Sequence, residues 1–159
     1  MAYAVQSDLV PLRMTQKDLN ELTIDNVPGQ TPIDPTSTEG LAIVAAVTSA
    51  ALEEASGRVD SYCRARYVTP LQQSDDVKSL TLDIAQYLLF SRRRTTKITD
   101  TVQERFNQAL AFLKDIAAAK ASLDQPATAA TPQSSLAGPE YSHKDRELTF
   151  REENIKGFV

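Results

Sequence analysis

Hydrophobic residues recur at helical spacing over three long segments of this chain. The first segment lies between about residues 39 and 66, the second follows Ser74, and the third follows Thr99. Apolar residues three and four positions apart share one face of an α-helix, so each segment is typical of an amphipathic helix. Short polar links join the segments, and helices joined in this way are expected to pack as an antiparallel bundle.

The first of these helices carries apolar residues on two sides. Its main stripe contains Leu41, Val44, Ala45, Thr48, Leu52, Ala55, Val59, Tyr62 and Cys63. A second and smaller stripe contains Ile43, Val47 and Ala50. Because a helix that is apolar on two sides is usually covered on two sides, we expect the domain to cover the main stripe and another subunit to cover the second.

Polar residues ahead of each segment predict where the helices begin. Thr38, Ser74 and Thr99 are the expected N-caps, because a hydroxyl at this position accepts a backbone N–H of the first turn. The first helix is expected to end near Arg66, since the proline of "YVTP" disfavours helix at the residue before it. Helix-favouring residues continue in the third segment to about Leu123.

Two small helices are predicted ahead of the bundle. Ser7 is expected to cap one, and Thr15 begins the other, where Thr15 and Asp18 form a looser version of the capping box. The stretch that follows, "DNVPGQTPIDPTST" at residues 25–38, is rich in proline and is expected to be a loop. Its acidic residues do not match the spacing of a calcium loop, so we expect no metal site there.

The composition changes after residue 123. Residues 124–139 are rich in Pro, Ala, Ser and Thr, and such a segment cannot bury enough apolar surface to fold alone. We therefore predict a helical domain over residues 1–123 and an extended C-terminal tail over residues 124–159. The tail carries spaced apolar residues that are expected to bind a partner or, alternatively, to fold back on the bundle: Tyr141, Leu148, Phe150, Ile155 and Phe158. The predicted fold class is all-α.

Charge and hydropathy narrow the class of function. The chain has 159 residues and a formal net charge of −4, whereas non-specific DNA binding depends largely on neutralising phosphates with a basic surface. No apolar run approaches the roughly 20 residues of a membrane span, so we expect no membrane association. The start, "MAYAVQSDLV", lacks the basic and apolar regions of a signal peptide.

The reactive residue types do not form a catalytic pattern. His143 is the single histidine and Cys63 the single cysteine, and they lie in different predicted parts of the chain. Glu53 and Glu54 are adjacent on a helix and point about 100° apart, so they do not converge on one site. The chain also lacks phosphate-binding glycine loops and paired metal-binding histidines. We therefore expect no enzyme, no cofactor and no metal.

Three consecutive arginines, Arg92, Arg93 and Arg94, follow the apolar stretch "DIAQYLLFS". Cations at the end of a helix complement its negative dipole, which is the first interpretation. The second is an ion pair or an assembly contact with a neighbouring subunit. The third is a contact with DNA phosphate, although a recognition helix would also need several polar residues that reach base edges.

Three stretches together resemble a known family. They are "GRVDSYCRARYVTPL" at 57–71, "DIAQYLLFSRRRTTKITDTVQERFNQALAFLKDIAAAKASL" at 83–123, and "LTFREENIKGF" at 148–158. Their order is similar to that of a Mu-like phage and prophage family of small virion proteins, related to the head–tail connector, or head-completion, proteins of long-tailed phages. The basic turn at Arg92–Arg94 is part of the shared pattern.

The resemblance implies a structural role in the virion. Such connectors are helical bundles that form a homo-oligomeric ring, expected to be dodecameric, below the portal protein. The ring extends the DNA channel without sequence-specific binding and gives a platform for the next neck, stopper or tail protein. The implied location is the head–tail neck of a virion assembled in the host cytoplasm. A small helical DNA-binding or regulatory protein that uses Arg92–Arg94 remains the alternative.

Overall fold

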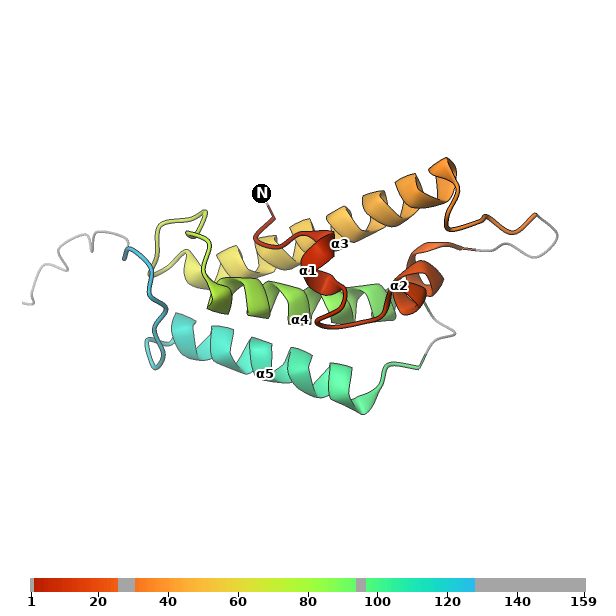
Figure 1. The fold of residues 1–159 in the computed structure, drawn as a ribbon. Coiled ribbons are helices and arrows are strands. Elements are labelled where there is room, and N and C mark those ends of the chain that lie inside the picture. Colours follow the sequence, from red (N-terminus) through yellow and green to blue (C-terminus); the bar gives the residue numbers. More distant parts are fainter. Residues whose placement is uncertain (1, 26–30, 94–96, 128–159) are drawn as a thin grey trace, which may run out of the picture. The chain divides into compact units, whose positions relative to one another are not determined.

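The computed structural model describes residues 2–25, 31–93 and 97–127, which belong to one compact unit of the chain. These residues form five α-helices and an isolated bridge between Tyr67 and Ala127. The helices, shown in Figure 1, are α1 (Gln6–Leu9), α2 (Gln16–Thr23), α3 (Thr38–Cys63), α4 (Asp75–Arg92) and α5 (Asp100–Ala117). The prediction of an all-α fold is confirmed.

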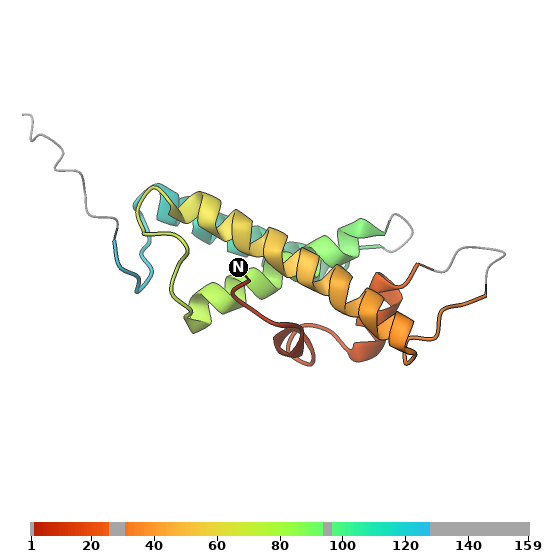
Figure 2. The same ribbon diagram turned by 90° about the horizontal axis from the view of Figure 1, so that it is seen from above.

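Helices α3, α4 and α5 form the predicted antiparallel bundle. Helix α4 contacts both of the others, and α3 also contacts α5 (Figure 1). The short helices α1 and α2 pack against α3 and α4, as the view from above shows (Figure 2). Tyr87 of α4 and Phe106 of α5 stack with ring centroids 3.8 Å apart, and this pair joins the second and third helices of the bundle.

The main stripe of α3 forms the core except near the start of the helix. Six of the nine predicted residues are buried: Val44, Thr48, Leu52, Ala55, Val59 and Cys63. The prediction is wrong for Leu41, which is 57% exposed, and for Ala45, which is also exposed. The reason is their position around the helix: each follows a buried residue, Gly40 or Val44, by one position and therefore points about 100° away from it.

Ser37, and not the predicted Thr38, caps α3. The Ser37 hydroxyl accepts the N–H of Gly40 at 3.0 Å. A Cβ at Gly40 would lie 2.2 Å from the backbone oxygen of Asp34, so only glycine fits there without a shift. The Asp34 carboxylate accepts the hydroxyl of Thr36 at 2.7 Å and its N–H at 2.8 Å, and these bonds lower its pKa. The start of α3 is therefore held by the preceding turn.

The other predicted helix ends differ in how well they agree with the structure. Ser74 caps α4 as predicted, and Thr15 with Asp18 forms the capping box of α2. Ser7 does not cap α1, because the helix already begins at Gln6. Thr99 is at the N-cap of α5, as predicted, but its side chain makes no capping hydrogen bond.

Helices α3 and α5 are both shorter than predicted. Helix α3 ends at Cys63 rather than near Arg66, and α5 ends at Ala117 rather than near Leu123. Ala119 has a φ of 61°, which lies in the left-handed region and interrupts the helical path. The chain then returns toward α3, where the N–H of Leu123 donates to the hydroxyl of Tyr67 at 2.8 Å.

Candidate functional site: the α4 end and the α3–α4 groove

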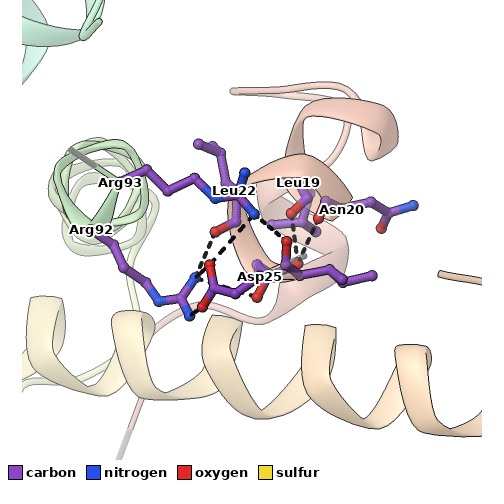
Figure 3. A network of polar contacts seen from close by, with 8 residues as sticks. Leu19, Asn20, Leu22, Asp25, Arg92 and Arg93 are labelled. Carbon is purple, nitrogen blue, oxygen red and sulfur yellow. Dashed lines mark hydrogen bonds and ion pairs between the residues drawn. The ribbon is translucent and has the colours of Figure 1, made fainter. Parts of the chain in front are cut away.

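Arg92, the last residue of α4, binds the end of α2 (Figure 3). Its Nη1 donates to the carbonyl of Leu22 at 2.9 Å and to that of Thr23 at 3.3 Å. The guanidinium also forms an ion pair with the carboxylate of Asp25. The last carbonyls of a helix have no partner within that helix, so Arg92 supplies donors that α2 itself lacks.

Arg93 lies beside the same cluster. Its Nη2 donates to the carbonyl of Ile24, the C-cap of α2, and lies 3.5 Å from Asp25 Oδ1. Two of the three arginines thus bind inside the chain, and Arg94 lies outside the described residues. The sequence favoured a helix end first and an ion pair second. The structure shows an ion pair within the chain, while an additional contact with another subunit stays a prediction.

An open groove of about 540 Å³ runs between α3 and α4. Its lining is mainly apolar and includes two residues of the predicted second stripe, Val47 and Ala50. The other lining residues are Ala51, Glu54, Arg58, Leu88, Leu89, Ser91 and Arg92. Ile43, the third residue of that stripe, is half-buried and packs against the core. The second stripe is therefore only partly covered by the described chain.

Arginines and one carboxylate stand at the edge of this groove. Arg58 pairs with Glu54 one turn earlier in α3 at 2.7 Å, with side-chain exposures of 41% and 56%. Exposed ion pairs of this kind contribute only about 0–1 kcal/mol, so Arg58 can share its charge with a further partner. Arg92 brings a second guanidinium from α4. The groove combines an apolar surface with two partly exposed guanidiniums, each already paired with one carboxylate.

The N-terminal segment lies on the opposite side of α3. The backbone N–H of Tyr3 donates to the hydroxyl of Ser56 at 3.1 Å. Ser56 and the groove residue Glu54 are two positions apart, which places them about 160° apart around the helix axis. The segment around Tyr3 therefore covers the flank of α3 that faces away from the groove.

Tyr3 fixes this N-terminal segment to the bundle. Its side chain is buried, its hydroxyl donates to Asp60 of α3, and the same oxygen accepts the N–H of Leu71 at 2.8 Å. Burial, and next the hydrogen bond to Asp60, raise the pKa of Tyr3 well above its ordinary value. The contact joins three segments that are distant in sequence.

The outward face of α3 consists mainly of small residues. Its exposed members outside the groove lining are Glu39, Ala42, Ala46, Ser49, Glu53 and Gly57. The outward face of α5 is instead polar and carries both signs of charge, with Glu104, Arg105, Gln108, Lys114 and Asp115 exposed. A Cβ at Gly57 would meet nothing within 4 Å. Packing within the described chain therefore does not require this glycine.

Cys63 is fully buried, and burial raises the pKa of its thiol to about 11. Within residues 2–25, 31–93 and 97–127, no group of three or more His, Cys, Asp or Glu residues is placed to hold a metal ion. No helix in that part of the chain is long and apolar enough to cross a membrane.

Several predicted residues lie outside the described part of the chain. They are Arg94, His143 and the five tail residues Tyr141, Leu148, Phe150, Ile155 and Phe158. Sequence reasoning missed Asp25 as the partner of Arg92, since 67 positions separate the two. It also missed the pair of Glu54 and Arg58, although their spacing of four residues on a helix is a signal that could have found it.

Comparison with known proteins gives one family match. A family model described as Bacteriophage Mu, Gp36 matches residues 3–139, which include all five helices. No curated protein matches the chain significantly. Of the three stretches that carry the sequence resemblance, those at 57–71 and 83–123 lie inside the matched range and that at 148–158 lies beyond it.

Proposed function

This chain belongs to the bacteriophage Mu Gp36 family, and from that premise we propose that it is a head–tail connector of a tailed phage. In this proposal the chain is a structural virion protein located in the head–tail neck. Its copies form a ring below the portal protein, and we expect this ring to be a dodecamer. The ring extends the DNA channel and offers a platform for the next neck, stopper or tail protein.

The observation that carries this proposal is the α3–α4 groove, which the described residues leave open. Val47 and Ala50 of the second apolar stripe line it together with Leu88. A ring requires each subunit to offer apolar surface to its neighbour, and this groove is such a surface on the described part of the chain. Ile43, the third residue of that stripe, is half-buried and packs against the core.

The arginines have a supporting role in the proposed ring. Arg92 lies at the groove edge and remains 35% exposed while it binds Asp25. Arg93 stabilises the end of α2 next to it. We propose that Arg92, Arg93 and Arg94 position the α2–α4 corner against a neighbouring subunit.

A ring of subunits with a net charge of −4 each would repel DNA phosphates and let DNA pass without binding.

The tail supplies the contact with the portal in this proposal. Apolar anchors that enter pockets provide much of the energy at protein interfaces, and the tail offers Tyr141, Leu148, Phe150, Ile155 and Phe158. Several tails on one ring would act together, so weak single contacts would still give tight attachment.

Mass photometry of the full chain, alone and with the portal protein of the same phage, tests the proposal. We expect a ring bound to the portal, and we expect the triple variant Phe150→Ala, Ile155→Ala, Phe158→Ala to lose portal binding. Phe112→Ala, which alters an exposed aromatic residue of α5, is the matched control and should bind normally. Absence of portal binding by the wild-type chain would refute the connector role.

A duplex DNA titration tests the alternative function. A DNA-binding protein that uses Arg92–Arg94 would bind duplex DNA with an affinity that falls steeply with salt. We expect negligible affinity, because Arg92 and Arg93 already bind Asp25 and the carbonyls of α2. Salt-sensitive binding that is lost when these arginines are neutralised would favour the alternative.

A further inference from the structure

We propose that the outward face of α3 in one copy of this chain binds the α3–α4 groove of a second copy. The outward face is the set of exposed residues between Glu39 and Gly57 defined above, and the groove is that lined by Val47, Ala50 and Leu88. The inference rests on the proposed ring and names the two surfaces that build it.

Charge complementarity identifies the occupant of the groove. The charged residues of the outward face are Glu39 and Glu53, both acidic and both exposed. Neither forms an ion pair within 4 Å in the described part of the chain. The groove edge instead carries two guanidiniums, Arg58 and Arg92, which pair with Glu54 and Asp25 but remain 41% and 35% exposed, so each can also bind a carboxylate of a second copy. Complementary charges of this kind fix the register of two surfaces and exclude incorrect partners.

The same charges argue against pairing of like surfaces. A two-fold contact of the outward face with itself would place two sets of glutamates, Glu39 and Glu53, opposite each other. A two-fold contact brings the same patch of both subunits together, whereas a head-to-tail contact joins two different patches and generates rings when the rotation closes. The acidic face and the two partly exposed arginines at the groove edge favour the head-to-tail arrangement.

The size of the residues suits the contact. The groove is shallow and open, with a volume of about 540 Å³, which accepts short side chains but not a whole helix. Ala42, Ala46 and Ser49 expose short side chains, and Gly57 has none. A glycine inside a helix costs about 1 kcal/mol relative to alanine. The open space around Gly57 permits close approach of a second backbone.

The position of the face on α3 also suits a contact between subunits. Helix α3 has 26 residues, whereas α4 and α5 have 18 each. Its N-terminal part diverges from α4 (Figure 1), and the turn at Asp34 together with Gly40 fixes its start. The outward face of α3 therefore lies on a helix whose orientation is fixed within the free subunit.

A charge-exchange experiment on the full chain tests this inference. One variant carries Glu39→Lys and Glu53→Lys, and the other carries Arg58→Glu. Each variant alone places like charges across the proposed contact, and we expect the concentration needed for half-assembly, alone or on the portal, to rise at least about tenfold. An equimolar mixture of the two variants restores opposite charges at both kinds of contact, so it should assemble like the wild type.

Matched controls separate folding from assembly. Glu104→Lys on the outward face of α5 changes charge in the same direction at an exposed helical position and should leave assembly unchanged. Circular dichroism on thermal unfolding checks that every variant is folded. Arg58→Glu also removes the pair with Glu54, so Arg58→Ala, which removes the same pair but adds no new charge, serves as a second variant and should weaken assembly less than Arg58→Glu.

The outcomes distinguish this inference from the proposed function. If wild-type rings form and the folded variants assemble equally well, the proposed interface is wrong and the connector role stands. If the single variants fail and the mixture also fails, the head-to-tail pairing is wrong. If the wild type forms no ring under any of these conditions, the connector proposal and this interface are both refuted.

Discussion

The guanidinium of Arg92 donates to the carbonyl of Leu22 at 2.9 Å, and this bond joins the end of α4 to the end of α2. The two residues are 70 positions apart. Leu22 is buried and belongs to the core, while the side chain of Arg92 is partly exposed. The contact therefore attaches the N-terminal helices to the bundle at the same corner where the groove begins.

Replacement of this arginine should loosen the N-terminal helices. Arg92→Ala leaves the carbonyls of Leu22 and Thr23 without their donor, and we expect the free energy of unfolding to fall by about 1–3 kcal/mol. Urea denaturation followed by circular dichroism measures the change. Arg105→Ala, at an exposed position of α5, is the control and should change it by less than about 0.5 kcal/mol. Equal effects of the two substitutions would contradict the assigned role of Arg92.

The two glycines of α3 should respond in opposite ways to alanine. Gly40→Ala places a Cβ against the backbone oxygen of Asp34, so we expect a loss of about 1–3 kcal/mol. Gly57→Ala meets open space, and the stiffer unfolded chain should stabilise the free protein by about 0.4–1 kcal/mol. Thermal unfolding of both variants checks the prediction. If both substitutions stabilised the protein, the turn before α3 would have moved to make room for the new Cβ at residue 40, and the predicted clash would be wrong.

Neighbouring residues of α5 provide a test of the core. Leu113 is fully buried and Phe112 is 36% exposed. Leu113→Ala removes buried apolar atoms and leaves a cavity, so we expect a loss of about 2–5 kcal/mol in chemical denaturation. Phe112→Ala should cost clearly less, although it removes the larger side chain. A larger loss of stability for Phe112→Ala than for Leu113→Ala would show that another part of the protein covers Phe112.

Cys63 should be unreactive in the folded protein. It is fully buried, and burial raises the pKa of its thiol to about 11, so both access and the thiolate fraction are low. Labelling with a thiol reagent at neutral pH should proceed only at the rate of unfolding, and it should become fast in denaturant. Fast labelling of the native protein would show that the core opens between α3 and α5.

The same shift predicts a loss of stability at alkaline pH. A raised folded-state pKa gives stability that is fully present below the unfolded value of 9.0 and lost as pH rises toward about 11. The raised pKa of Tyr3 acts in the same direction at still higher pH. Denaturant titrations between pH 8 and about 11 should therefore show a smaller decline for Cys63→Ala than for the wild type. An equal decline in both proteins would assign the alkaline effect to other groups.

Local patterns determined much of the architecture. The periodic apolar positions predicted three long helices, and Ser74 and the pair of Thr15 and Asp18 marked two of the starts. These features depend on interactions within a few residues, such as a hydroxyl that accepts an N–H of the next turn. The family resemblance, which residues 57–71 and 83–123 carried inside the matched range, is likewise a property of the sequence.

Only the tertiary structure decided which surfaces remain open and which charges pair. The same apolar pattern includes Val44, which is buried, and Leu41, which is exposed, because burial depends on which side of α3 the neighbouring segments cover. Asp25 belonged to a predicted loop, yet it binds Arg92 across 67 positions of sequence. Such contacts depend on how whole helices cross, and that geometry arises from packing between distant segments and not from the spacing of residues within one of them.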